Sequence, residues 1–75
     1  MEYLKESDFL IAFGKNLRKY RKLKGFTQEQ LAIDLNIEIS QISRIERGVI
    51  NTSIGNINAI SKVLKIDIKE LFDFN

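Results

Sequence analysis

Two short amphipathic patterns, joined by a tight turn, occupy residues 27–48 and constrain the fold more than any other part of the sequence. The first runs from Gln28 to about Leu35 and the second from about Ile39 to Arg47, each with apolar residues at the spacing of one helix face. Asn36 lies between them and can take the left-handed conformation that ends a helix. The sequence therefore predicts two helices joined by a tight turn.

Capping residues define the ends of these two helices. Thr27 and Gln30 have the spacing of a capping box, in which each side chain bonds the backbone N–H of the other residue. Glu38 is expected to start the helix at 39–47, the third helix of the chain, where the helix dipole favours its carboxylate. Gly48 is expected to end that helix. These caps predict the same boundaries as the apolar spacing.

The segment before this pair has the pattern of a longer helix. We expect this helix to begin at Ser7 or Asp8, because either side chain can accept a bond from an unpaired backbone N–H. It should end at about Lys24, since Gly25 suits the left-handed position that follows a helix. Residues 1–6 are expected to form a frayed lead-in.

Two more helical patterns follow. Ser53 can cap a fourth helix, and Asp67 can cap a brief fifth one. The 75 residues allow one small domain, and the chain contains no proline. The sequence predicts an all-α fold of five short helices in a single domain, residues 1–75. The apolar stripe of the fourth helix would comprise Ile54, Ile57, Ile60, Ser61 and Leu64.

Composition excludes several classes of function. Without cysteine or histidine, the chain lacks thiolate metal ligands, disulfides and the usual general base, so we expect no metal and no cofactor. It also lacks a glycine-rich phosphate loop and carboxylates paired at a fixed spacing, so we do not expect an enzyme. No apolar run is long enough to span a membrane, and the N-terminal residues do not form a signal peptide. We expect a cytoplasmic protein without an evident small-molecule ligand.

Charge is distributed unevenly along the chain. Residues 15–47 hold eight Lys or Arg and four Asp or Glu, whereas the remainder holds four basic and six acidic residues. Such asymmetry creates one pole that attracts polyanions. Within that pole, the outer face of the predicted helix at 39–47 shows hydroxyl and guanidinium groups and no acid, which suits base edges and phosphates in a DNA groove. That outer face carries Ser40, Ser43, Arg44 and Arg47, and the opposite face carries Ile42, Ile45 and Glu46.

Two charged residues fall on the inner stripes of their helices. Arg21 lies on the apolar stripe of the first helix, and Glu46 lies on the inner face of the helix at 39–47. Either ion alone would be buried without a partner, so we expect them to form an ion pair. Gly14 lies on the same stripe as Arg21 and would allow another helix to cross closely.

The chain resembles the Cro/phage-repressor (XRE-type) family over roughly residues 10–72. The family pattern is Thr/Ser-Gln-x-x-Leu-Ala, then a turn, then Ser-x-Ile-Ser-x-Ile-Glu-x-Gly. The resemblance implies a lambda-repressor-like DNA-binding domain in which helices 2 and 3 form the helix-turn-helix. Small stand-alone repressors and the controller proteins of restriction–modification systems are similar in size and pattern. The pattern is filled by Thr27, Gln28, Leu31, Ala32, Ser40, Ile42, Ser43, Ile45, Glu46 and Gly48.

The resemblance also implies roles for individual residues. Ile39, Ser40, Gln41 and Arg44 would contact bases, with arginine suited to guanine and an apolar residue suited to the thymine methyl group. The role of Glu38 stays open: it stabilises the helix N-terminus, or it accepts a bond from a cytosine amino group. Contacts to phosphates would come from Gln28, Ser43, Arg47 and Asn51.

Apolar residues gather at the C-terminal end of the sequence. Ile68, Phe72 and Phe74 either complete the core or form a two-fold contact between copies of the chain, as in relatives of this kind. Phe74 follows the last helix and is expected to remain exposed. We expect a homodimer, in which the two recognition helices lie about 34 Å apart, one turn of DNA.

The most concrete function that the sequence predicts is sequence-specific binding to double-stranded DNA. The protein would act as a transcriptional repressor. It would bind a palindromic operator as a homodimer, with helix 3 (residues 39–47) in the major groove. The alternative is a protein-interaction module of the same fold, such as an antitoxin or an adaptor. RNA binding is disfavoured because no aromatic residue lies on the outer face of the helix at 39–47 to stack on a base.

Overall fold

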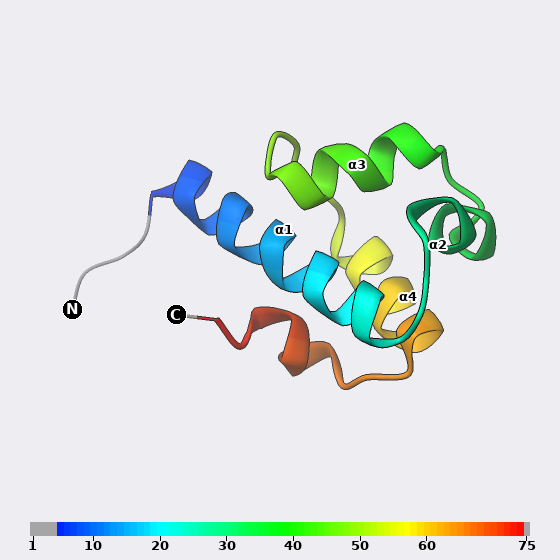
Figure 1. Ribbon diagram of the computed structural model, residues 1–75. Helices are drawn as coiled ribbons and strands as arrows, with labels where there is room; N and C mark the ends of the chain where they lie inside the picture. The colour runs from blue at the N-terminus through cyan, green and yellow to red at the C-terminus, as the bar shows by residue number, and fades with distance from the viewer. Residues whose placement is uncertain (1–4, 75) are drawn as a thin grey trace.

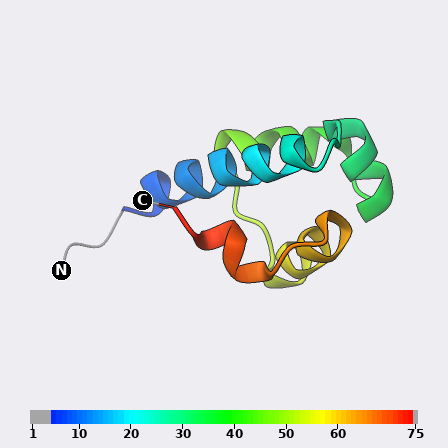
Figure 2. The same cartoon turned by 60° about the horizontal axis from the view of Figure 1, so that its bottom comes forward.

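The computed structural model describes residues 5–74. Four α-helices and one 3₁₀-helix follow one another, with the long first helix in the middle of the arrangement (Figures 1 and 2). The elements are α1 (Glu6–Leu23), α2 (Gln28–Leu35), α3 (Ile39–Arg47), α4 (Ile54–Leu64) and η1 (Ile68–Phe72). Both α3 and η1 pack against α1, while α2 packs against α3 and α4.

One apolar core joins all five elements. α1 contributes two residues to it, each other element contributes at least one, and all of these side chains lie almost entirely out of contact with water. Burial of this kind is the main favourable term for a domain of this size. The core consists of Phe13, Leu17, Leu31, Ala32, Ile42, Ile45, Ile60, Leu64 and Leu71.

The turns predicted at the helix ends are confirmed. Asn36 takes a left-handed conformation with φ 57°, and Gly25 and Gly48 have φ values of 79° and 73°. Thr27 accepts a bond from the backbone N–H of Gln30 at 3.0 Å. The second half of the capping box is absent, because the Gln30 side chain donates to Asp34 instead, one helical turn further on.

The first helix begins earlier than predicted. It starts at Glu6 after Lys5, which caps it without a side-chain hydrogen bond, so neither Ser7 nor Asp8 is the cap. Asp8 lies inside the first turn, where a carboxylate is favourable beside the positive end of the helix dipole. Glu6 was predicted to lie in the frayed lead-in but belongs to α1. Residues 1–4 lie outside the described part of the chain.

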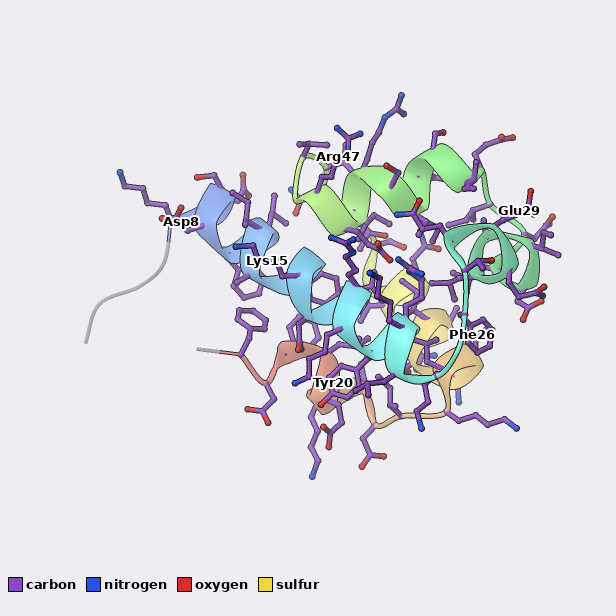
Figure 3. The ribbon with its side chains drawn as sticks, viewed as in Figure 1. Asp8, Lys15, Tyr20, Phe26, Glu29 and Arg47 are labelled. Carbon is purple, nitrogen blue, oxygen red and sulfur yellow. The ribbon has the colours of Figure 1, made fainter. Side chains whose placement is uncertain are left out.

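The predicted fifth α-helix is a 3₁₀-helix. Asp67 is its N-cap residue, as predicted, but the Asp67 side chain makes no capping hydrogen bond. Side-chain bonds tie this helix to α1. The buried Asn16 amide donates to the carbonyls of Glu70 and Leu71, both at 2.8 Å. The bond to Leu71 satisfies a carbonyl at the end of the helix, whereas the Glu70 carbonyl also accepts from the Asp73 backbone N–H. The Tyr20 hydroxyl donates to the Glu70 carboxylate at 2.8 Å, and this bond raises the pKa of Tyr20. Figure 3 shows Tyr20 beside η1.

Two apolar side chains lie elsewhere than predicted. Ile54 was expected on the inner stripe of α4 but is 81% exposed, because it occupies the first position of the helix, before the packed face begins. Phe74 was expected to be exposed but is partly buried against the core. Its ring meets that of Phe9, with 5.5 Å between the centroids, so the end of the chain folds back onto the first turns of α1.

Candidate nucleic-acid interface

α3 is held closely against α1 through its backbone. A Cβ atom on Gly14 would lie 2.5 Å from the carbonyl oxygens of both Ile45 and Glu46, so only glycine allows this approach. The inner face of α3 is anchored by Ile42 and Ile45, which are almost completely buried. Figure 1 shows α3 along the outside of the molecule, with its far side free of other elements.

An ion pair joins α1 to α3 beneath this outer face. The Arg21 guanidinium donates to both carboxylate oxygens of Glu46, from Nε at 2.5 Å and from Nη2 at 3.1 Å. The two side chains are only 8% and 3% exposed, so the pair that the apolar stripes predicted is present and buried. Arg21 also donates from Nη1 to the carbonyl of Phe26 at 2.7 Å, which fixes the turn before α2.

The N-terminus of α2 is tied to the same carboxylate. The Gln28 side chain donates from Nε2 to Glu46 Oε1 at 3.0 Å. This bond was not foreseen from the sequence, where Gln28 was assigned a phosphate contact. The bond uses one of the two amide N–H groups, because a primary amide has two donors.

The outer face of α3 presents most of the residues that the resemblance assigned to bases. Ile39 is 46% exposed, as expected, and Ser40 and Arg44 are exposed as well. Gln41 is half-buried, since it lies nearer the packed side. These four side chains therefore share one accessible surface at the start and middle of the helix.

The residues assigned to phosphates fall into two places. Gln28, Ser43 and Arg47 line a shallow polar groove between α1, α2 and α3. Arg47 lies toward the end of α3 at the edge of the molecule (Figure 3). Asn51 is separate: it is exposed on the loop between α3 and α4. The sequence prediction left out Arg18, whose side chain completes the groove from α1. The groove lining also includes Arg21 and Glu46.

Glu38 precedes this surface and is exposed. It caps α3 through its backbone only, without a side-chain hydrogen bond. Its carboxylate is therefore not fixed by the helix end, and both roles considered for it from the sequence stay open.

An aromatic cluster lies at the other side of α1, where the two ends of the described chain meet. Phe72 stacks near Phe9 and tilts against Phe13, with 6.3 and 5.1 Å between ring centroids. Ile68 and Phe72 are each 40% exposed, so η1 keeps an accessible apolar surface. Sequence reasoning missed Phe9, although its spacing of four residues from Phe13 places both on one face of α1.

Within residues 5–74, no group of three or more Asp or Glu side chains is arranged to hold a metal ion. Among the helices that the structure describes, none is long and apolar enough to cross a membrane.

Comparison with known proteins identifies a matching family and close relatives. A helix-turn-helix family model, HTH_3, matches residues 17–71. The control protein C.BamHI from Bacillus amyloliquefaciens is 42% identical over 65 residues, which cover 85% of this chain and 80% of that protein. The HTH-type transcriptional regulator SlrR from Bacillus subtilis is 41% identical over 61 residues, which cover 80% of this chain but only 40% of SlrR.

Solved structures share the arrangement. The restriction–modification controller protein C.AhdI from Aeromonas hydrophila superposes with a TM-score of 0.81 and 40% identity, covering 84% of this chain and 96% of that one. SinR, a master regulator of biofilm formation, was solved in complex with DNA. It superposes with a TM-score of 0.76 and 34% identity, covering 81% of this chain and 98% of the solved one.

Proposed function

Since the chain belongs to the helix-turn-helix family of bacterial transcription regulators, we propose that it binds double-stranded DNA in a sequence-specific manner with α3 in the major groove. The observation that carries this proposal is the outer face of α3, where exposed hydroxyl and guanidinium groups stand on a helix whose inner face is anchored by buried isoleucines. A major groove admits one α-helix, and a fixed helix places its side chains against base edges. The solved complex of SinR with DNA supports this use of the fold.

Roles within the interface follow from chemistry and position. Arg44 is the residue best suited to bind guanine, because it is exposed at the middle of α3 and its guanidinium can make two parallel bonds to O6 and N7. Ser40 and Gln41 lie in the first turn of α3, where a recognition helix comes nearest to the bases. Ile39 offers an apolar surface to a thymine methyl group.

Phosphate contacts would surround these base contacts. Gln28, Ser43 and Arg47 line the groove on one side of α3, and Asn51 lies on the loop that follows it. Bonds to the backbone fix the register of a protein on the duplex without selecting a sequence. The groove therefore positions the helix, and the outer face of α3 supplies specificity.

A homodimer would place two such helices on one operator. The exposed apolar surface of η1, formed by Ile68 and Phe72, is the proposed contact between the two copies. Phe74 belongs to the same contact, because its ring packs on Phe9, which in turn stacks on Phe72. η1 and α3 both pack against α1 and lie on different sides of it (Figure 1). A single module contacts few base pairs, and a dimer multiplies its discrimination.

The biological role proposed is a cytoplasmic regulator, a repressor when its palindromic operator overlaps a promoter. The relatives are described as control proteins and transcriptional regulators, which argues against an enzyme. A protein-interaction module of the same fold, an antitoxin or an adaptor, is the alternative, because the fold alone does not distinguish the two.

Salt dependence separates these two functions. Binding to a mixed-sequence duplex, followed by fluorescence anisotropy of the labelled DNA, should weaken roughly a hundredfold between 50 and 200 mM salt, the change expected for about four neutralised phosphates in a dimer. The cations that would neutralise them are Arg18 and Arg47 of each copy, which line the polar groove. An absence of binding to any duplex at low salt would favour the protein-interaction module.

A further inference from the structure

The carboxylate of Glu46 accepts more bonds than an ion pair requires. Oε2 accepts from Arg21 Nε, and Oε1 accepts from both Arg21 Nη2 at 3.1 Å and Gln28 Nε2 at 3.0 Å. Three helices thus meet at one buried carboxylate: Arg21 comes from α1, Gln28 from α2 and Glu46 from α3. Arg21 already neutralises the charge of this carboxylate, so the bond from Gln28 is not needed for that purpose.

Gln28 lines the polar groove, and its amide has a second N–H that is not used in the bond to Glu46. Gln28 is the first residue of α2 and only half-buried, and the groove beside it is also lined by Arg18 and Arg47. With Arg21 included, the groove holds three cations and one carboxylate, so its net charge is positive. In a positively charged groove, the acceptor best suited to the free N–H of Gln28 is an anionic oxygen. The groove is open, so the phosphate backbone of a duplex could reach it.

We propose that Glu46 is a positioning residue for DNA binding: by holding one amide N–H of Gln28, it directs the other toward a phosphate of the bound duplex. The inference rests on the proposed function, since it concerns the same interface. A long amide side chain without this bond would sample several rotamers, and that freedom would be lost on binding. The buried ion pair therefore contributes to affinity through Gln28 as well as to stability.

Substitutions at Glu46 can separate these two contributions. Glu46→Gln removes the charge but keeps an oxygen that can accept from Gln28. The double substitution Arg21→Met with Glu46→Leu removes the acceptor but fills the space with apolar side chains of similar volume, a change that is often tolerated at buried ion pairs. Each variant is measured twice, by thermal unfolding and by affinity for one duplex that the native protein binds tightly.

Affinity and stability are expected to change in opposite ways. Glu46→Gln should unfold at a lower temperature yet bind DNA within about threefold of the native protein. The Met/Leu pair should unfold near the native temperature yet bind at least about tenfold more weakly, the effect of a bond to a charged group. Gln28→Ala should weaken DNA binding by a similar factor in the native protein, and by less than about twofold in the variant that carries both Arg21→Met and Glu46→Leu.

Two results would overturn the inference: affinity that follows unfolding temperature in both variants, or an equal cost of Gln28→Ala in both backgrounds. Absence of DNA binding by the native protein would instead refute the proposed function. Nuclear magnetic resonance of the ¹⁵N-labelled native protein gives a check that needs no folded variant. Of the two proton signals of the Gln28 side-chain amide, one should shift strongly on addition of the duplex, and the other, from the N–H bonded to Glu46, should shift little. Equal shifts of both signals, or no shift of either, would count against a fixed Gln28 amide.

Discussion

Replacing Arg21 with methionine alone should lower the free energy of unfolding by about 3–5 kcal/mol, the cost of leaving a buried charge without its partner. The substitution keeps the apolar stem but removes the bonds to both oxygens of Glu46 and the bond to the Phe26 carbonyl. The remaining bond from Gln28 cannot neutralise the carboxylate. For a domain of this size, such a loss lowers the unfolding temperature by about 12 °C or more.

The measurement is urea unfolding followed by circular dichroism, with native and variant proteins at the same concentration because dimerisation would add to the apparent stability. Lys22→Met is the matched control: the neighbouring side chain is exposed, so its removal should change the free energy of unfolding by no more than about 0.5 kcal/mol. An Arg21 variant as stable as this control would show that the ion pair does not support the fold.

Replacing Arg44 with alanine should weaken binding to the preferred operator by about 2–6 kcal/mol in a dimer, because each lost pair of bonds to guanine is worth about 1–3 kcal/mol. The lower end of that range corresponds to an affinity about thirtyfold weaker. Arg44 is exposed, and its side chain makes none of the hydrogen bonds or ion pairs described within residues 5–74. The unfolding temperature should therefore stay close to the native value.

The control is Lys62→Ala, which removes an equal charge from the exposed surface of α4. Affinity is compared on the preferred operator and on a scrambled duplex. The Arg44 variant should lose both affinity and the preference between the two duplexes, whereas the Lys62 variant should retain that preference. An equal loss on both duplexes would assign Arg44 to the phosphate backbone.

The sequence predicted features that depend on neighbouring residues or on single exceptional positions. Asn36 and Gly48 marked the helix ends because few other residues adopt positive φ easily. Arg21 and Glu46 were recognised as partners because each interrupts an apolar stripe, and opposite charges in one core must meet. Gly14 signalled a close crossing for a similar reason: glycine inside a helix costs stability unless space requires it.

Other features depend on distances that only the folded chain defines. Gln28 has several possible acceptors, and its bond to Glu46 exists because α2 begins beside the last turn of α3. The short final helix is held against α1 by Asn16, more than fifty residues earlier, whose side chain donates to its carbonyls. Phe74 packs on Phe9 because both ends of the described chain meet at one end of α1, which periodicity alone does not indicate.

Two copies of this chain are proposed to place α3 in successive major grooves of one duplex. Selection of bound sequences from a random duplex library, with native protein at moderate salt, tests DNA binding, dimerisation and half-site spacing together. The expected result is a palindromic consensus whose half-sites lie about one helical turn apart, roughly 10 base pairs from centre to centre. Recovery of unenriched sequences, or of a consensus without two-fold symmetry, would contradict the claim.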